Sequence, residues 1–310
     1  MIEVRGLTRY YGDHPAAVDL SFTISSNEVV GFLGLNGAGK STTLKILAGL
    51  LLPSAGSVRI GGVDLLEAPD SIRARIGFLP EEPPLYRDMR VSDFIQYVGQ
   101  LKGMPKAEVL ARLPGVLKQC NIADVADRVI SELSLGYRKR VGIAQAIIHK
   151  PQLVILDEPI SGLDPRQIRE MRDLIVSLKR DSTVLVSSHI LPEISQTCDR
   201  ILVLAGGRLV AEGTEEQLAS HMTRSNRVQV SVRGSAEAVQ AALGALGWVT
   251  QVQLHAQHGD FVSFNATLDG DRREELAAAL VTAGLGLRRL DAASGELEEI
   301  FLNLTKEARA

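Results

Sequence analysis

The stretch GLNGAGKS, residues 34–41, decides the fold, because it fits the spacing G-x-x-x-x-G-K-[ST] of a phosphate-binding loop at every position. An apolar strand is predicted just before it, at residues 28–33, and helical spacing begins at Ser41. Glycines let the backbone curl so that successive N–H groups converge on phosphate oxygens, while the following helix points its positive end at the same charge. The alternative is a glycine-rich turn without function, which the flanking strand and helix disfavour. The stretch therefore predicts a nucleoside triphosphate site.

The residues of this loop are expected to share the contacts to the nucleotide. Lys40 would reach the β and γ phosphates, and the Ser41 hydroxyl would take a place on Mg²⁺. A nucleoside triphosphate and Mg²⁺ are thus the expected ligands, and the loop alone does not say which nucleotide. The predicted nucleotide-binding set in this stretch is Gly34, Asn36, Gly37, Ala38, Gly39, Lys40, Ser41 and Thr42.

A pair of carboxylates follows a second apolar strand. In LVILDEP, residues 153–159, Asp157 and Glu158 stand at the C-terminal end of the strand, the edge of an α/β sheet where ligands bind. Asp157 is predicted to hold Mg²⁺ through water, and Glu158 to orient and deprotonate the attacking water. Two surface acids in a turn are the alternative. The phosphate loop elsewhere in the chain favours the functional interpretation.

Continuous apolar strands that alternate with helices predict a parallel sheet covered on both faces. Ser92 is expected to cap the first helix of the segment 91–148. Beyond residues 221–226 the order becomes strand, helix, strand, strand, helix, strand, which predicts a ferredoxin-like α+β sandwich closed by a final helix at 296–304. The remaining expected strands are 2–7, 17–24, 57–60, 153–156, 183–186, 201–204 and 208–212, with a helix at 166–179.

The length and the charge of the chain limit which domain organisation and which binding partners are expected. The 310 residues suffice for two domains, predicted at 1–221 and 222–310. A formal net charge of -3 without a long Lys/Arg run argues against binding of nucleic acid. The apolar runs are far shorter than the ~20 residues of a membrane-spanning helix, so no span is expected. Cys120 and Cys198 match no metal spacing and are interpreted as inert thiols.

The series GLNGAGKST, LSLGYRKRVGIAQAI, LVILDEP, SGLDP and SSH, in this order over residues 1–220, resembles the ATP-binding subunit of an ABC transporter. The stretches LPEEPPLY, LSLGYRKR and LEEIFLNLT are similar to the bacterial exporter branch that includes gliding-motility and multidrug ATPases. The resemblance implies a P-loop ABC-type ATPase domain with a parallel sheet core, an antiparallel β subdomain and a helical subdomain. The small ferredoxin-like domain would follow it.

In that family two nucleotide domains pair head to tail, and each ATP lies between the phosphate loop of one chain and the signature stretch of the other. By this resemblance the Ser134 hydroxyl and the Gly136 N–H would meet the γ-phosphate in trans, and Asp164 would help to shape the partner's site. Leu135 and Tyr137 depart from the commonest signature, LSGGQ, so the contact of its Gln is not carried over. The alternative for this stretch is an ordinary capped helix.

The resemblance also implies roles for single residues. Tyr11 would stack on adenine, with Tyr10 as the competing candidate, and Glu81 would replace a Gln that senses Mg²⁺ and water. The Glu81 carboxylate either binds the metal or is solvated. His189 matches the switch histidine that bonds the γ-phosphate. The implied catalytic residues are Lys40, Glu158 and His189, and the implied metal residues are Ser41, Glu81 and Asp157.

The other histidines, His14 among them, lack such a context and are expected to have no role in the site, and the basic run 138–140 is expected to be a solvated first helical turn. The resemblance implies an ATP-hydrolysing subunit that pairs with a second copy of itself or with a homologous ATPase. It would drive export by separate polytopic permease subunits, from the cytoplasmic face of the inner membrane. Residues 83–100 would form the groove for the permease.

A soluble ABC-type ATPase acting on ribosomes or DNA is the alternative function. One phosphate loop, one signature stretch and no heptad-rich insertion argue against it. The C-terminal domain could bind a small regulator or dock on a partner chain, because this fold hosts many roles. The transported substrate cannot be read from the sequence.

Overall fold

The computed structural model describes residues 1–222 and 227–292. These residues form two compact units, 1–215 and 216–292. The predicted boundary between residues 221 and 222 falls at the end of helix α8 (Glu215–Met222). The predicted final helix at 296–304 lies outside the described residues.

A mixed six-stranded sheet forms the centre of the first unit, in the order β10-β9-β3-β8-β7-β6. Neighbouring strands from β9 to β6 are parallel, and β10 pairs antiparallel with β9 at the edge. The carboxyl ends of β3, β7 and β8 therefore meet at one edge. The strands are β3 (Val29–Leu33), β6 (Ile76–Leu79), β7 (Leu153–Asp157), β8 (Thr183–Ser188), β9 (Arg200–Ala205) and β10 (Arg208–Gly213).

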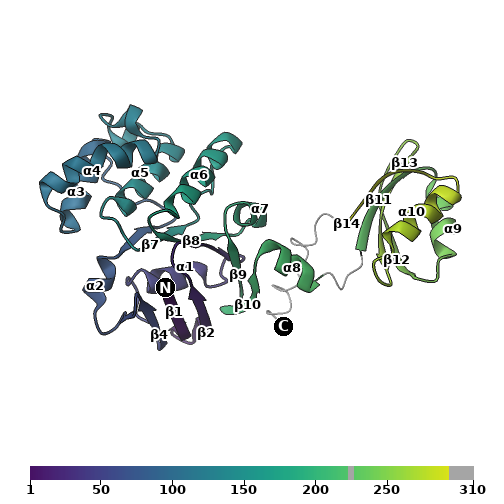
Figure 1. Ribbon diagram of the computed structural model, residues 1–310, viewed down its shortest axis with the longest axis horizontal. Coiled ribbons are helices and arrows are strands. Elements are labelled where there is room, and N and C mark those ends of the chain that lie inside the picture. The colour runs from purple at the N-terminus through teal and green to yellow at the C-terminus, as the bar shows by residue number, and fades with distance from the viewer. Residues whose placement is uncertain (223–226, 293–310) are drawn as a thin grey trace. The chain divides into compact units, whose positions relative to one another are not determined.

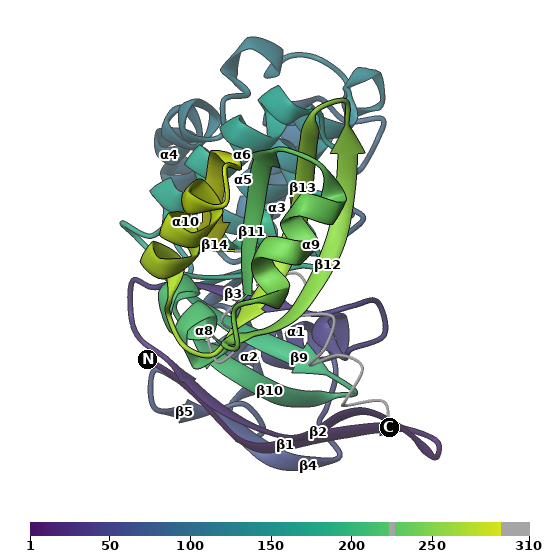
Figure 2. The ribbon, with the colours of Figure 1, turned by 90° about the vertical axis from the view of Figure 1, so that its right-hand side faces the viewer.

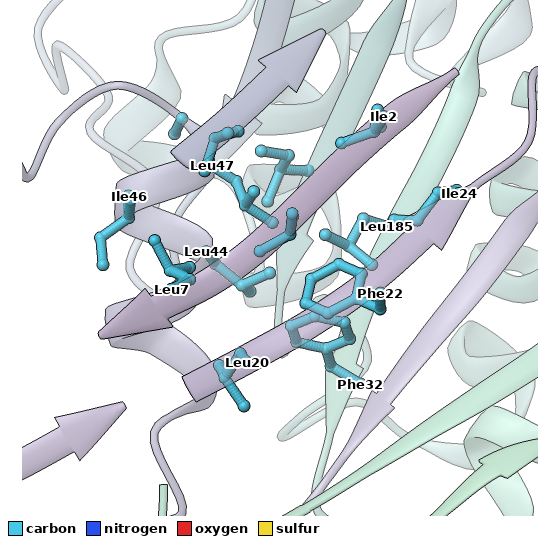
Figure 3. Packing of buried hydrophobic residues seen from close by; sticks show 14 of the residues in the cluster. Ile2, Leu7, Leu20, Phe22, Ile24, Phe32, Leu44, Ile46, Leu47 and Leu185 are labelled. Atoms are coloured by element: carbon cyan, nitrogen blue, oxygen red, sulfur yellow. The ribbon is translucent and has the colours of Figure 1, made fainter. Parts of the chain in front are cut away.

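A four-stranded antiparallel sheet, in the order β2-β1-β4-β5, packs with helix α1 (Lys40–Leu47) against this core. Figure 3 shows the shared cluster, in which Leu44 and Leu47 of α1 join side chains of β1 and β2. Phe22 and Phe32 meet edge to face, with ring centroids 5.4 Å apart. Each such fully buried side chain contributes about 1.5–3 kcal/mol. The strands are β1 (Ile2–Tyr11), β2 (His14–Ile24), β4 (Ala55–Ile60) and β5 (Val63–Asp64).

Helices α3, α4 and α5 pack against one another (Figure 1), and α5 also packs against β6 and β7 of the central sheet. The prediction that Ser92 caps the first of them is wrong. Helix α3 begins at Val91, and the N–H groups of Val91 and Ser92 donate to the carbonyls of Arg128 and Ala126, so these donors need no side-chain cap. The helices of this unit are α2 (Pro69–Arg73), α3 (Val91–Leu101), α4 (Lys106–Gln119), α5 (Leu135–Ile147), α6 (Pro165–Leu178) and α7 (Leu191–Ser195).

The second unit is a four-stranded antiparallel sheet in the order β12-β13-β11-β14. Figure 2 shows its two helices on the same face of the sheet. Alternate residues of β13, such as Val262 and Phe264, are buried beneath Leu243 of α9 and Leu276 of α10. The elements are β11 (Arg227–Arg233), α9 (Ala236–Gly244), β12 (Val249–His258), β13 (Phe261–Leu268), α10 (Arg273–Thr282) and β14 (Gly286–Ala292).

Across the described part of the chain, we find no helix with the length and apolar character that a membrane span requires.

Candidate functional site

A cavity of about 440 Å³ opens at the edge where β3, β7 and β8 end. The phosphate loop follows β3, Glu158 follows β7, and His189 follows β8, so three segments far apart in the sequence supply its walls. The lining residues are His14, Ala16, Leu35, Asn36, Gly37, Gly39, Lys40, Ser41, Thr42, Glu81, Glu158, Ser161 and His189.

The phosphate loop has the backbone that its glycines predict. Gly39 has φ 98°, and a Cβ at this position would lie 2.2 Å from the carbonyl oxygen of Ala16, so only glycine fits between the loop and β2. Helix α1 begins at the next residue, Lys40, whose buried ammonium donates to the Gly34 carbonyl at 2.7 Å. The lysine thus reaches back across the loop.

A single hydroxyl binds both acidic residues at the end of β7. Ser187 Oγ, on the neighbouring strand β8, donates to Asp157 Oδ1 at 2.6 Å and accepts from the Glu158 N–H at 2.9 Å. Glu158 itself has φ 48°, in the left-handed region that is unfavourable for a residue with a side chain. This turn directs the Glu158 side chain into the cavity, whereas Asp157 is buried behind it and is not among the lining residues.

The Glu158 carboxylate lies between a lysine and a histidine. Its Oε2 accepts from His189 Nδ1 at 3.0 Å, and its Oε1 lies 3.4 Å from Lys40 Nζ. Oε1 is buried and makes no hydrogen bond to any described residue, so the Lys40 contact is an ion pair without hydrogen-bond geometry. An unsatisfied buried acceptor costs about 1–3 kcal/mol, which makes this oxygen a natural acceptor for a water or a ligand group in the cavity.

His189 is held by its neighbours. Ser188 Oγ donates to the buried carboxylate of Glu193, at 2.7 Å from its Oε2, and accepts from the Ile190 N–H at 3.0 Å. The two residues that flank His189 are thus connected to each other, and through Ser188 to Glu193. Burial raises the pKa of Glu193 above its ordinary value, and the Ser188 hydrogen bond opposes this shift. The imidazole is 40% exposed and faces the cavity.

The prediction that residues 138–140 form a solvated turn is wrong. Lys139 and Arg140 are only 3% and 7% exposed. The Lys139 ammonium donates to the backbone carbonyls of Glu158 at 2.7 Å and Ser161 at 2.8 Å. Arg140 covers the ring of Tyr137 at 4.6 Å. These partners compensate for the loss of water around the two cations.

The residues predicted to act in trans lie away from the cavity of their own chain. Ser134 is the N-cap residue of α5, and its Oγ accepts a long bond of 3.5 Å from the Tyr137 N–H. A Cβ on Gly136 would lie 2.8 Å from Gln167 Oε1. Asp164 caps α6 by accepting from the N–H groups of residues 166 and 167, and it lines a separate hollow of about 620 Å³.

The aromatic residue predicted to meet adenine also stands outside the lining. Tyr11 is 48% exposed at the end of β1, with the Arg9 guanidinium 5.1 Å from its ring centre, and Tyr10 is 44% exposed. His14, which was expected to have no role, lines the cavity instead. His14 pairs opposite Tyr11 at the tip of the β1–β2 hairpin, a register that only the structure shows.

The oxygen donors at this edge fit a magnesium ion that arrives with a nucleotide. Mg²⁺ takes one or two protein oxygens, with phosphates and water completing its shell, whereas zinc takes clustered His and Cys. Ser41 and Glu81 line the cavity, and Asp157 stands behind it. Within residues 1–222 and 227–292, no three His, Cys, Asp or Glu side chains gather in a way that could hold a metal by themselves.

The family model described as "ABC transporter" matches residues 17–161. An uncharacterized ABC transporter ATP-binding protein of Methanocaldococcus jannaschii is 40% identical over 222 residues, 71% of this chain and 80% of that protein. The daunorubicin/doxorubicin resistance ATP-binding protein of Streptomyces peucetius is 33% identical over 309 residues, 98% and 92% of the two chains. A solved dimeric ATP-binding cassette, in a post-hydrolysis state with ADP and Pi, is 25% identical with a TM-score of 0.62, covering 69% of this chain and 98% of that one. The chain therefore belongs to the ATP-binding proteins of ABC transporters, and it is an ATPase.

Proposed function

We propose that this chain powers export through separate membrane permease subunits, by binding two ATP molecules between two copies of itself and hydrolysing them. The observation that carries the proposal is the single cavity in which Lys40, Glu158 and His189 converge. A triphosphate in this cavity would replace the Gly34 carbonyl as the partner of the Lys40 ammonium. Successive loop N–H groups would bind the remaining phosphate oxygens.

Hydrolysis then needs a base for the attacking water. Glu158 takes a proton from that water as its oxygen bonds to the γ-phosphorus, and the bond from phosphorus to the β-bridging oxygen breaks to leave ADP. His189 holds the Glu158 carboxylate in the ground state and bonds the γ-phosphate. Mg²⁺, held by Ser41 and, through water, by Asp157 and Glu81, would neutralise the phosphate charge. Tyr11 would stack on the adenine ring from the hairpin tip.

The second half of each site comes from the other copy. Ser134 and Gly136 stand at the N-terminus of α5, where a helix dipole favours phosphate, and they are too far from their own cavity to line it. Asp164 stands near them at the start of α6. The dimeric cassette with ADP and Pi, a structural relative of this chain, supports the pairing of two copies here.

An aromatic cluster supports a permease groove at residues 83–100. Tyr86 and Tyr97 are 53% and 41% exposed and lie against each other, with ring centroids 5.6 Å apart. Tyr86 also meets the buried Phe94. Exposed aromatic rings that pack against a buried ring are typical of a protein–protein interface. The drug-resistance relative favours export, and the chain would then sit peripherally at the cytoplasmic face of the membrane.

The strand order β12-β13-β11-β14 with two helices on one face supports a ferredoxin-like assignment for the accessory domain, proposed at residues 222–310. The export role can be tested by purifying the tagged chain from detergent extracts. Co-purification of a polytopic membrane protein, lost in Tyr86→Ser/Tyr97→Ser, supports it. Salt-sensitive binding of nucleic acid, without any such partner, would instead favour a soluble ATPase acting on ribosomes or DNA.

A further inference from the structure

Helix α5 carries a buried lysine that reaches the turn after β7. Lys139 is 3% exposed, and its ammonium donates to the carbonyls of Glu158 and Ser161 at 2.7 and 2.8 Å. We propose that Lys139 is a positioning residue, which fixes the Glu158 turn and links it to the helix end that meets the other nucleotide. This inference rests on the proposed function, since it concerns the same pair of nucleotide sites.

The first step of the argument concerns the backbone of Glu158. Its φ of 48° is a conformation that costs about 1–3 kcal/mol and persists only where the surroundings hold it. The N–H of Glu158 is bound by Ser187 Oγ, and its C=O is bound by Lys139 Nζ. Both peptide groups that flank the Glu158 side chain are thus held. Without the lysine, the Glu158 carbonyl would lose its 2.7 Å bond and keep only the 3.4 Å bond from the Ser161 N–H, so the direction of the carboxylate would be less strictly fixed.

The second step concerns the charge. Carboxylates of Glu158, Glu81 and Glu193 all favour the protonated ammonium of Lys139, while burial acts first and lowers its pKa below the ordinary value. A neutral apolar side chain of the same length would fill the space. It would leave the Glu158 carbonyl with only the long bond of 3.4 Å from the Ser161 N–H, and it would remove the Lys139 donor from the part-buried Ser161 carbonyl. It would also remove a positive charge from a region rich in acids.

The third step concerns the position of Lys139 on its helix. Ser134 is the N-cap residue of α5, and Lys139 lies five residues further along, about 7.5 Å at the rise of an α-helix. A packed helix moves as a rigid body over that distance. Docking of the Ser134 end against the nucleotide of the partner chain would therefore be transmitted through Lys139 to Glu158, which acts on the nucleotide of its own chain.

The test uses the full-length chain with Lys139→Met, an apolar side chain of similar length. The matched control is Lys106→Met, at an exposed lysine of α4. Steady-state phosphate release gives kcat and KM for Mg-ATP. Calorimetric titration of ATP gives its Kd. Sedimentation with Mg-ATP, with Lys139→Met placed in a Glu158→Gln background, measures nucleotide-driven dimer formation.

We expect kcat of Lys139→Met to fall by at least about tenfold, as for a displaced catalytic group, while KM, ATP affinity and dimer formation stay near those of the control. Lys139→Gln keeps N–H donors on a shorter side chain and should recover part of kcat; it replaces the Met variant if that one does not fold. A kcat equal to the control would overturn the proposal. Parallel loss of ATP binding or of the dimer would also overturn it, because it would indicate a merely structural role. Turnover of the wild-type chain that is lost in Glu158→Gln would uphold the proposed role of Glu158 in either case.

Discussion

The imidazole of His189 donates its Nδ1 hydrogen to Glu158 Oε2 across 3.0 Å. This contact joins the residues that follow two adjacent parallel strands, since β7 and β8 pair in register and both end at the cavity. The other oxygen of the same carboxylate, Oε1, faces Lys40 at 3.4 Å without a hydrogen bond. The carboxylate is therefore oriented by His189 through Oε2, while the buried Oε1 lacks a hydrogen-bond donor and can accept a proton from a water placed beside it.

Glu158→Gln should abolish turnover while ATP still binds. The amide keeps the size of the side chain and can still contact His189, but it cannot take a proton, so kcat should fall by about 10²–10⁴-fold. Phosphate release and calorimetric ATP titration measure the two properties. Glu67→Gln, at an exposed carboxylate outside the cavity, is the control. Turnover of Glu158→Gln at the wild-type rate would show that another group is the base.

His189→Ala should lower kcat more than it raises KM. The substitution removes the donor that orients Glu158 and, in the proposed mechanism, a bond to the γ-phosphate. Losing one donor aimed at the transition state costs on the order of 10²-fold in kcat. His189→Gln, which can still donate, should retain more activity than His189→Ala. Equal kinetics for wild type and His189→Ala would remove this residue from the mechanism.

Gly39→Ala should weaken both ATP binding and folding. The new methyl would lie 2.2 Å from the Ala16 carbonyl oxygen on a backbone with φ 98°, and such strain costs about 1–3 kcal/mol. Denaturant unfolding and ATP titration measure the two effects. Gly115→Ala in α4 is the matched control, because no atom lies within 4 Å of its Cβ. That change should be neutral or stabilise the helix by up to about 1 kcal/mol.

His149 should make the stability of the first unit fall in mild acid. Its Nε2 lies 3.0 Å from the Ile76 carbonyl oxygen, and burial lowers the pKa of this residue from 6.5 to about 4. Between pH 6.5 and about pH 4 the histidine of the unfolded chain is protonated while that of the folded chain stays neutral. The folded state therefore loses stability as the pH falls from 6.5 towards 4. The free energy of unfolding decreases by no more than about 1.4 kcal/mol per pH unit.

The matching variant is His149→Leu, which has no group that titrates in this window. The unfolding free energy of wild type minus that of this variant should fall as the pH is lowered from 7 to 4. Denaturant unfolding at several pH values measures the difference. A difference that does not change with pH would mean that His149 is not held neutral by its surroundings.

The phosphate loop could be predicted from the sequence because its chemistry is local. Eight consecutive residues supply the glycines, the lysine and the hydroxyl. The acids at 157 and 158 could be predicted for a similar reason, since a short apolar strand ends directly before them. The predicted membership of the ABC transporter ATP-binding proteins is confirmed by the relatives.

Other features depend on contacts between distant segments. Strand β6 has only four residues and was not predicted, although it pairs with β7 and leads to Glu81. Lys139 was assigned to solvent because charged residues on a helix usually face water. Only the packing of α5 against the turn at residues 158–161 shows that its ammonium is buried. His14 reaches the cavity through a hairpin whose register the sequence does not reveal.

The ATP-driven pairing of two copies is tested most directly by sedimentation of the Glu158→Gln variant with and without saturating Mg-ATP. The account predicts a monomer without nucleotide and a dimer with it, and Ser134→Arg in the same background should abolish the dimer while leaving ATP binding to the phosphate loop. A variant that remains monomeric with bound Mg-ATP, both alone and with its native permease, would contradict the account.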